Sequence, residues 1–227
     1  MNSDKFKGCH FPKAIVLQSV YWYLRYSLSY RDIEELMNER GVDVDHSTAQ
    51  RWVVKYTGIV EESFRKKKKS VGKSWRMDET YIKIKGKWHY LYRAVDKEGN
   101  TIDFLLTRKR DLKAAKLFLV KAINYNGLPE KITIDKSGAN KAAIAEYNAE
   151  HKTSIEIRQV KYLNNIVEQD HRGIKRIIRP MLGFKEFFSA SVTLRGIELV
   201  RMIRKGQLKT QNKFIQNPAE IFYSLAA

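Results

Sequence analysis

The fold is decided by residues 76–107, RMDETYIKIKGKWHYLYRAVDKEGNTIDFLLT, a stretch rich in β-branched and aromatic residues. In its first part polar and apolar residues alternate, and Asp78 falls on the same face as Ile82. Residues 85–87 and 97–100 each hold a glycine, which tight turns favour. The stretch therefore predicts an antiparallel meander of three strands, at residues 76–84, 88–96 and 101–107.

Helices and short strands alternate after this meander. Asp111 can cap the first helix, and Pro180 ends the long helix that precedes it. The elements predicted, in order, are a helix at 112–125, a strand at 131–135, a helix at 140–151, a strand at 155–160, and helices at 166–179 and 189–205. The order βββ-α-β-α-β-α predicts an α/β fold, a ribonuclease H-like mixed five-stranded sheet with flanking helices.

The residues before the meander predict a different architecture. Residues 11–60 read as an all-α helix-turn-helix domain, in which Pro12 can open the first helix. Ser29 and Asp32 form a capping-box pattern for the second helix, and Asp45 or Ser47 can cap a third at 48–56. That third helix should bury one apolar face, made of Ala49, Trp52, Val53 and Tyr56.

The opposite face of the third helix is polar. It presents four candidate DNA-binding residues, Ser47, Gln50, Arg51 and Lys55. Gln and Arg are the side chains that pair bidentately with adenine and guanine in the major groove. An ordinary helical bundle with a solvated polar face is the alternative interpretation.

The overall charge points to a nucleic-acid partner. The 227 residues include 43 Lys and Arg against 25 Asp and Glu, a net charge of +18, and neutralising phosphates would release counterions. A basic protein without this role and an acidic membrane surface are the alternatives. The run 65–69, RKKKK, predicts an extended basic linker. We therefore divide the chain into the helical domain, a linker at 61–74, a catalytic domain at 75–180 and a C-terminal helical extension at 181–227.

Cysteine usage and hydropathy suggest the compartment. Cys9 is the single cysteine, so no disulfide can form within the chain and a His-His-Cys-Cys zinc module is excluded. Residues 1–10 do not resemble a signal peptide, and the apolar stretch 14–30 is too short and interrupted to span a bilayer. We expect a bacterial cytoplasmic protein associated with the nucleoid.

Three acids lie where the predicted fold would bring them together. Asp78 lies inside the first strand, Asp135 ends the fourth strand beside it, and Glu168 lies in the first turn of the helix after the fifth. A carboxylate is disfavoured inside a strand and costly to bury unpaired. Two hard cations about 4 Å apart can clamp the attacking and leaving oxygens of a displacement at phosphorus. The three acids are therefore candidate catalytic residues and candidate ligands of two Mg²⁺ or Mn²⁺ ions.

The helix that carries Glu168 is amphipathic. Its apolar side is predicted to pack through Ile166, Val167, Ile174, Ile177 and Ile178. The other side places His171, Arg172 and Lys175 around Glu168, an arrangement suited to a metal site beside phosphodiesters. His171 can be a metal ligand or a residue that pairs with Asp170 or Glu168. Other acids, among them Glu79, Asp96, Asp103 and Asp170, are interpreted as surface or ion-pair residues.

Three segments around these acids resemble the bacterial DDE insertion-sequence transposases, and the insertion-sequence 6 family most of all. They are Trp75–Tyr81, Thr133–Asn140 and Asn164–Arg172. The likeness extends to Tyr30–Leu36 and His46–Trp52 in the helical domain, and so covers nearly the whole chain.

The resemblance implies a metal-dependent recombinase. Such an enzyme binds the terminal inverted repeats of its element, nicks to free a 3′-hydroxyl and joins that end to double-stranded target DNA, typically through cointegrates. It also implies that Lys175, seven positions after Glu168, holds the terminal phosphodiester, with Arg172 one turn before it. Related elements act as dimers or larger assemblies. A catalytically silent DNA-binding regulator derived from a transposase, and a nuclease acting on structured nucleic acid, are the competing interpretations.

Overall fold

The protein is described from a computed structural model, which covers residues 6, 7, 9–181, 183–209 and 217–226, with only the backbone of Lys161. The chain forms two compact units. One consists of residues 70–173, and the other combines the segment up to residue 69 with the segment from residue 174 onward.

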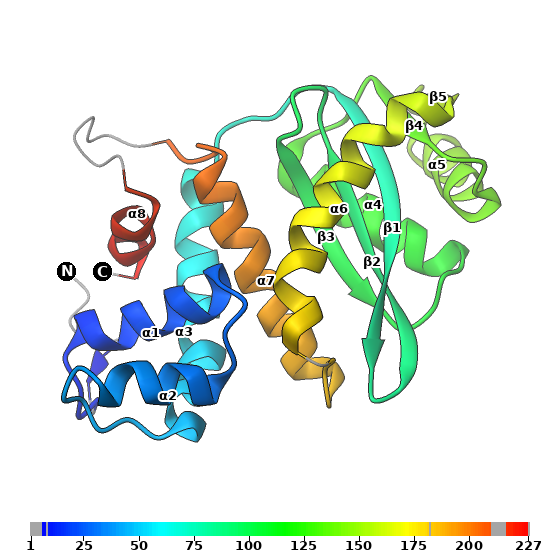
Figure 1. Ribbon diagram of the computed structural model, residues 1–227. Coiled ribbons are helices and arrows are strands. Elements are labelled where there is room, and N and C mark those ends of the chain that lie inside the picture. The colour runs from blue at the N-terminus through cyan, green and yellow to red at the C-terminus, as the bar shows by residue number, and fades with distance from the viewer. Residues whose placement is uncertain (1–5, 8, 182, 210–216, 227) are drawn as a thin grey trace. The chain divides into compact units, whose positions relative to one another are not determined.

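The unit of residues 70–173 is built on one five-stranded sheet (Figure 1). Its strands are β1 (Ser74–Ile84), β2 (Lys87–Val95), β3 (Thr101–Thr107), β4 (Lys131–Ile134) and β5 (Glu156–Gln159). The strand order is β3-β2-β1-β4-β5, with β1, β2 and β3 antiparallel and with β4 and β5 parallel to β1. This mixed sheet with its flanking helices is the ribonuclease H-like fold that the sequence predicted, and the prediction is confirmed.

The strand register brings two of the predicted acids level with each other. β1 pairs with β4 from Ser74 to Arg76, and Arg76 lies opposite Thr133. Asp78 and Asp135 each follow by two residues, so parallel pairing carries them to the same height in neighbouring segments. The glycine turns confirm the meander, because Gly86 and Gly99 both take the positive φ values, 77° and 82°, that glycine adopts without strain.

Side chains of β1 alternate between two environments. Trp75 and Met77 belong to a buried core with residues of α4 (Leu112–Asn126) and α5 (Gly138–His151), among them Phe118 and Ile144. Asp78 must point to the opposite face, because successive side chains in a strand alternate. That face carries the first part of α6 (Asn165–Ile178), whose residue His171 approaches Asp78. Asp111 caps α4 through the Ala114 amide, as predicted.

The other unit is helical. Its helices are α1 (Lys13–Arg25), α2 (Tyr30–Asn38), α3 (His46–Lys67), α7 (Phe187–Arg204) and α8 (Pro218–Leu225). α3 packs against α1, α2 and α7, while α8 packs against α1, α3 and α7. The predicted capping box of α2 is present, with Ser29 and Asp32 bonded reciprocally. The packing of α7 and α8 on the N-terminal helices was not foreseen, and neither was α8 itself. The domain division made from the sequence, and the helix-turn-helix assignment, stay predictions.

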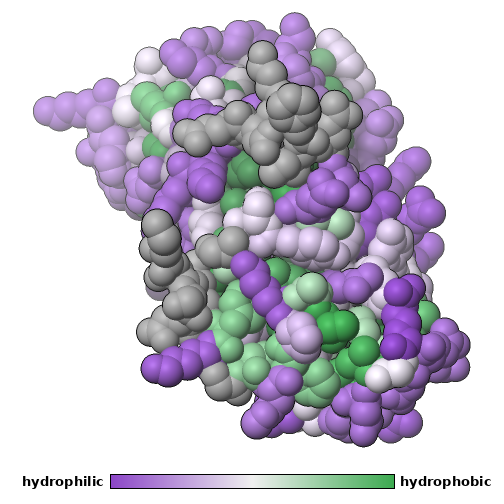
Figure 2. Space-filling model, turned by 90° about the vertical axis from the view of Figure 1, so that its left-hand side faces the viewer, coloured by the Kyte–Doolittle hydropathy of each residue, from purple (hydrophilic) through white to green (hydrophobic). Residues whose placement is uncertain are grey.

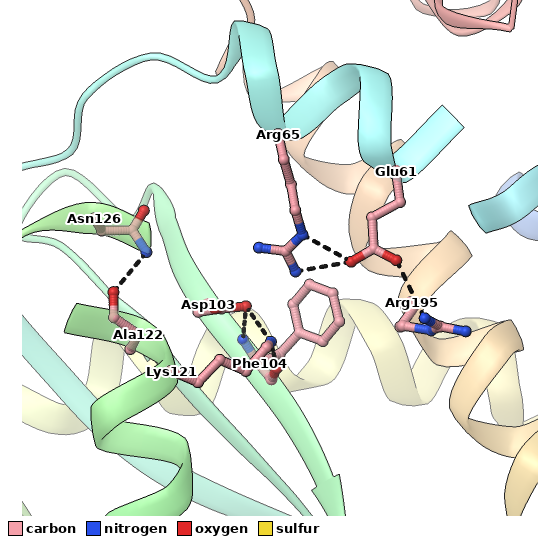
Figure 3. A network of polar contacts seen from close by, with 8 residues as sticks. All are labelled: Glu61, Arg65, Asp103, Phe104, Lys121, Ala122, Asn126 and Arg195. Atoms are coloured by element: carbon pink, nitrogen blue, oxygen red, sulfur yellow. Dashed lines mark hydrogen bonds and ion pairs between the residues drawn. The ribbon is translucent and has the colours of Figure 1, made fainter. Parts of the chain in front are cut away.

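Helix α3 is longer than predicted, and the expectation of an extended basic run is wrong for residues 65–67. Val60 and Phe64 continue its apolar face and are fully buried. Glu61 accepts hydrogen bonds from Arg65 one turn later, at 2.9 and 2.8 Å, and also lies 3.5 Å from Arg195 of α7 (Figure 3). These contacts offset the repulsion between neighbouring cations, so the helix continues to Lys67.

The surface is mainly polar, as the composition suggests. Figure 2 shows the face on the left of Figure 1, where hydrophilic side chains surround an apolar area in the lower half.

None of the helices in the described part of the chain is both long enough and apolar enough to cross a bilayer.

Candidate active site

The structure brings the three predicted carboxylates together on the sheet. Asp78 lies within β1, Asp135 directly follows β4, and Glu168 lies in the first turn of α6. Burial is the main cause that raises the pKa of Asp78 to about 7, and the negative charges of Glu79, Asp135 and Glu168 raise it as well. A carboxylate influences another this way only over a short distance. Asp135 and Glu168 therefore act on the same site as Asp78.

The donor set fits hard divalent cations. His171 Nδ1 lies 3.7 Å from Asp78 Oδ2, a distance too long for a hydrogen bond. A group of carboxylates whose shared charge raises a pKa is stabilised by a cation that binds among them, and oxygen ligands suit Mg²⁺ and Mn²⁺. Asp78, Asp135 and Glu168 are the residues that can hold such ions.

The triad is more open than a single-ion cage. In the described part of the chain, the group whose three ligand atoms all lie within 4.8 Å of one another is Glu34, Asp45 and His46, not the triad. The ligand atoms of the triad therefore do not form a compact single-ion group in this structure.

A network behind β1 supports the site from the opposite face. Glu79 follows Asp78 and its side chain is 2% exposed. Its carboxylate forms an ion pair with Arg110 and accepts a hydrogen bond of 3.0 Å from Asn140 Nδ2. Asn140 lies in the first turn of α5, directly after the loop that holds Asp135. The network therefore connects β1, which carries Asp78, to the segment that carries Asp135. Of the two alternatives for Glu79, a surface residue or an ion-pair residue, the ion pair is confirmed.

A second ion pair fastens α6 to the sheet. Arg93 of β2 lies opposite Asp78 in the strand register and forms an ion pair with Asp170, two residues after Glu168. The Arg93 side chain is fully buried and that of Asp170 is 11% exposed. This contact fixes the rotation of α6 and hence the direction of Glu168. The ion-pair interpretation of Asp170 is confirmed.

The exposed side of α6 is largely the one predicted. Glu168, Arg172 and Lys175 are exposed, whereas the apolar residues Val167 and Ile174 are fully buried. His171 differs from the prediction, because it is only 5% exposed and turns toward Asp78 on the packed side. The reason is helical geometry: His171 lies four residues after Val167 and three before Ile174, so it shares their buried face. Roles for Arg172 and Lys175 in binding DNA stay predictions.

Two sequence comparisons identify the family. A family model described as a DDE domain matches residues 72–207. The transposase for the insertion sequence-like element IS431mec of Staphylococcus aureus is 44% identical over 206 residues, which make up 90% of each chain. The chain belongs to the insertion-sequence 6 family of DDE transposases. The transposase for insertion sequence element IS257 in transposon Tn4003, also from Staphylococcus aureus, is 43% identical over the same length and coverage. The resemblance found in the sequence is confirmed.

Solved structures of low sequence identity are also similar to this DDE family member. The trimeric form of the HTLV-2 integrase catalytic core domain in complex with magnesium is 18% identical, with a TM-score of 0.46 over 67% of this chain and 97% of that chain. The catalytic core domain of BIV integrase is 17% identical, with a TM-score of 0.45 over 67% of this chain and 95% of that chain.

Helix α3 of this DDE family member presents the predicted polar face. Ser47, Gln50, Arg51 and Lys55 are all exposed. The opposite face is buried as predicted, through Ala49, Trp52, Val53 and Tyr56. Their exposure leaves the four polar side chains available to a duplex, and their contact with DNA stays a prediction.

The compact group Glu34, Asp45 and His46 joins α2 to the start of α3. His46 Nδ1 lies 2.9 Å from Glu34 Oε2 and 3.3 Å from Asp45 Oδ2. Asp45 also caps α3 by accepting a hydrogen bond of 2.8 Å from the Ser47 amide. The cap and the ion pairs account for the group as a link between two helices. The sequence gave no reason to connect Glu34 with His46, which lies 12 residues away.

The remaining buried acids have structural partners. Asp103 is 1% exposed and accepts a hydrogen bond of 2.8 Å from Lys121, which also donates to the Phe104 carbonyl (Figure 3). Asp96 is 1% exposed and accepts from the backbone amides of Gly72 and Asn100 at the turn between β2 and β3. Of the two alternatives that the sequence left for these acids, the ion pair is confirmed for Asp103, and a surface position is wrong for Asp96.

Proposed function

We propose that the protein is a DDE transposase that binds the terminal inverted repeats of its element, nicks the DNA there and joins the freed 3′ end to target DNA in replicative transposition. Its relatives at 44% and 43% identity are named as transposases of insertion sequences. The observation that carries the proposal is the approach of Asp135 and Glu168 to the largely buried Asp78, whose pKa burial and the neighbouring carboxylates raise to about 7.

The three acids would hold two divalent ions, Mg²⁺ or Mn²⁺. When bound, the ions supply Lewis-acid polarisation of the scissile phosphate and a deprotonated water or 3′-hydroxyl as the nucleophile. Asp78 would give up its remaining proton on binding positive charge, because a pKa of about 7 leaves it about half protonated at neutral pH otherwise. The buried contacts of Glu79 with Asn140 and of Arg93 with Asp170 keep the carboxylates in place.

Recognition of the DNA falls to exposed basic residues. Arg172 and Lys175 lie on the same side of α6 as Glu168 and are placed to bind the terminal phosphodiester. The outer face of α3, from Ser47 to Lys55, would read base edges in the major groove. Because two element ends must be joined to one target, the working form is a homodimer or a larger assembly on double-stranded DNA. We place this protein in the bacterial cytoplasm, associated with the nucleoid.

The decisive experiment removes one carboxylate while its shape is retained. Asp78→Asn should abolish strand transfer of element ends in Mg²⁺ and leave end binding intact, because the amide cannot neutralise a metal ion. Glu156→Gln is the matched control, since Glu156 is exposed on β5 and pairs with Arg158. Joining by the Asp78→Asn variant would overturn the assignment. Binding without nicking by the wild-type protein would favour the alternative, a catalytically silent regulator.

A further inference from the structure

The hairpin formed by β1 and β2 extends beyond the rest of its sheet. β4 pairs with β1 only as far as Arg76, and β3 begins to pair with β2 at Tyr90. Among the described residues, the pairs from Ile82–His89 to Ile84–Lys87 therefore have no third strand beside them. Figure 1 shows this end of the hairpin running past the neighbouring strands.

One face of this extension is aromatic. Tyr81, Lys83, Trp88 and Tyr90 share a face, since Tyr81 lies opposite Tyr90 and Lys83 opposite Trp88 in the register. We call these four residues the aromatic face. The Tyr81 ring lies 6.0 Å from the Trp88 ring and 5.3 Å from the Tyr90 ring, centroid to centroid, and Lys83 Nζ lies 5.7 Å from the Trp88 centroid. Tyr81 is 48% and Trp88 57% exposed, so much of their ring surface meets water.

The surroundings of the aromatic face are basic. Residues 81–90 contain three lysines and no acid. The segment 108–110, RKR, follows Thr107, the residue that pairs with Tyr90, and all three of its side chains are exposed. Such a surface is complementary to a polyanion and repels cationic partners.

Hairpin stability does not account for this arrangement. Cross-strand aromatic pairs do stabilise hairpins, but their contacts leave half of the Tyr81 and Trp88 surface in water. Exposed rings among lysines are typical of surfaces on which bases stack while cations follow the phosphates. In an intact duplex the base faces are hidden by stacking. The partner that suits these rings is therefore a base that has left its stack.

We infer that the aromatic face binds an unstacked base of single-stranded or opened DNA, with the lysines of the hairpin on the adjoining phosphates. The inference rests on the proposed function for the presence of a DNA strand, and it adds which part of that strand is held. Tyr81 lies three residues beyond Asp78 on β1, about 10 Å along the strand, and it shares the face of Glu79, which is opposite that of Asp78. A strand that leaves the site of cleavage would therefore reach the aromatic face by passing around the free end of the hairpin, beyond the neighbouring strands.

The test compares two DNA probes of arbitrary sequence by fluorescence anisotropy in EDTA. One probe is a blunt duplex, and the other is the same duplex with a short oligothymidine overhang. The wild-type protein should prefer the overhang. Trp88→Ala and Tyr81→Ala should each weaken binding of the overhang probe by about 5- to 150-fold, the loss that follows from about 1–3 kcal/mol of stacking. Binding of the blunt probe should change little.

Matched variants separate stacking from other effects. Trp88→Phe keeps a ring and should keep most of the preference for the overhang. Tyr125→Ala removes a ring of similar exposure, 61%, from α4 of the same unit and should leave the preference unchanged. Circular dichroism checks that each variant is folded.

Three results would overturn the inference. They are no preference for the overhang in the wild type, equal losses on both probes in Trp88→Ala, and a change of oligomeric state in Trp88→Ala with the preference intact. The last result would make the aromatic face an interface between copies of the chain. Strand transfer by the wild-type protein is assayed separately. If transfer fails while the overhang preference depends on Trp88, the proposed function falls and the aromatic face stands.

Discussion

Replacing Asp78 with asparagine should stabilise the protein when no divalent ion is present. Asp78 is largely buried, and Asp135, Glu168 and Glu79 all add negative charge around it. Its pKa rises for these reasons from 3.8 to about 7. The folded state therefore carries a cost whenever Asp78 is ionised, and the unfolded chain does not.

The size of this cost and its dependence on pH follow from the pKa of Asp78. Below about pH 4 Asp78 is protonated in both states, and no cost arises. Between about pH 4 and pH 7 the unfolded chain ionises first, so stability falls as the pH rises. Above about pH 7 the full cost is about 4 kcal/mol, at about 1.4 kcal/mol for each pKa unit. Asn carries no charge, but its amide must still be buried. We therefore expect Asp78→Asn to raise the free energy of unfolding by about 2–4 kcal/mol at about pH 8.

The assay is urea unfolding followed by tryptophan fluorescence in EDTA, at about pH 5 and about pH 8. The increase in unfolding free energy caused by Asp78→Asn should be larger at the higher pH. Adding Mg²⁺ should stabilise the wild type more than the variant. Glu156→Gln is the control of opposite sign, because the neighbouring Arg158 lowers the pKa of Glu156, and it should show no gain. An Asp78→Asn variant that is less stable than the wild type at about pH 8, or equally stabilised at both pH values, would refute the reasoning.

Three further outcomes are expected. Asn140→Ala should lower the unfolding free energy by about 1–3 kcal/mol in urea, because Glu79 loses a buried donor at 3.0 Å, and an unchanged midpoint would contradict the support role. Arg93→Met should lower the unfolding free energy by about 3–5 kcal/mol, and the double variant with Asp170→Leu should cost less, since the single change removes the Arg93 cation from the nearly buried Asp170 carboxylate. The logarithm of the affinity for duplex DNA should fall linearly with the logarithm of the salt concentration, as phosphate contacts require. An affinity that does not change with salt in anisotropy titrations would exclude such contacts.

Local signals in the sequence predicted much of the fold. Glycine turns, strand alternation and the capping box of Ser29 and Asp32 act within a few residues, and the structure contains all of them. The length of α3 was missed although Val60 and Phe64 continue the helical spacing of its apolar face, because the basic run 65–69 was taken to indicate an extended linker. The packing of α7 and α8 on α1 and α3 was missed because it joins segments far apart in sequence, which no local pattern reveals.

The residues of the site also divide into those that the sequence predicted and those that it did not. The three acids were recognisable because an aspartate inside a strand needs a special reason, and because the strand order placed the other two nearby. Their supports were not recognisable. Asn140 and Glu79 are 61 residues apart, and Arg93 and Asp170 are 77 apart. Nothing in the spacing of an amide or an arginine says which distant carboxylate it will contact. His171 was misplaced because the buried face of α6 is wider than predicted and includes the position between Val167 and Ile174.

Asp78 and Glu79 show how a strand separates a structural acid from a functional one. They are adjacent in sequence, so the alternation of β1 sends them to opposite faces. On one face Glu79 is compensated by Arg110 and Asn140. On the other, Asp78 faces two further carboxylates, with a histidine nitrogen at 3.7 Å. Asp78 also accepts a hydrogen bond from the Glu79 amide, yet burial and the neighbouring carboxylates still raise its pKa. This incomplete compensation is what bound cations would offset, and it supports the proposed metal site.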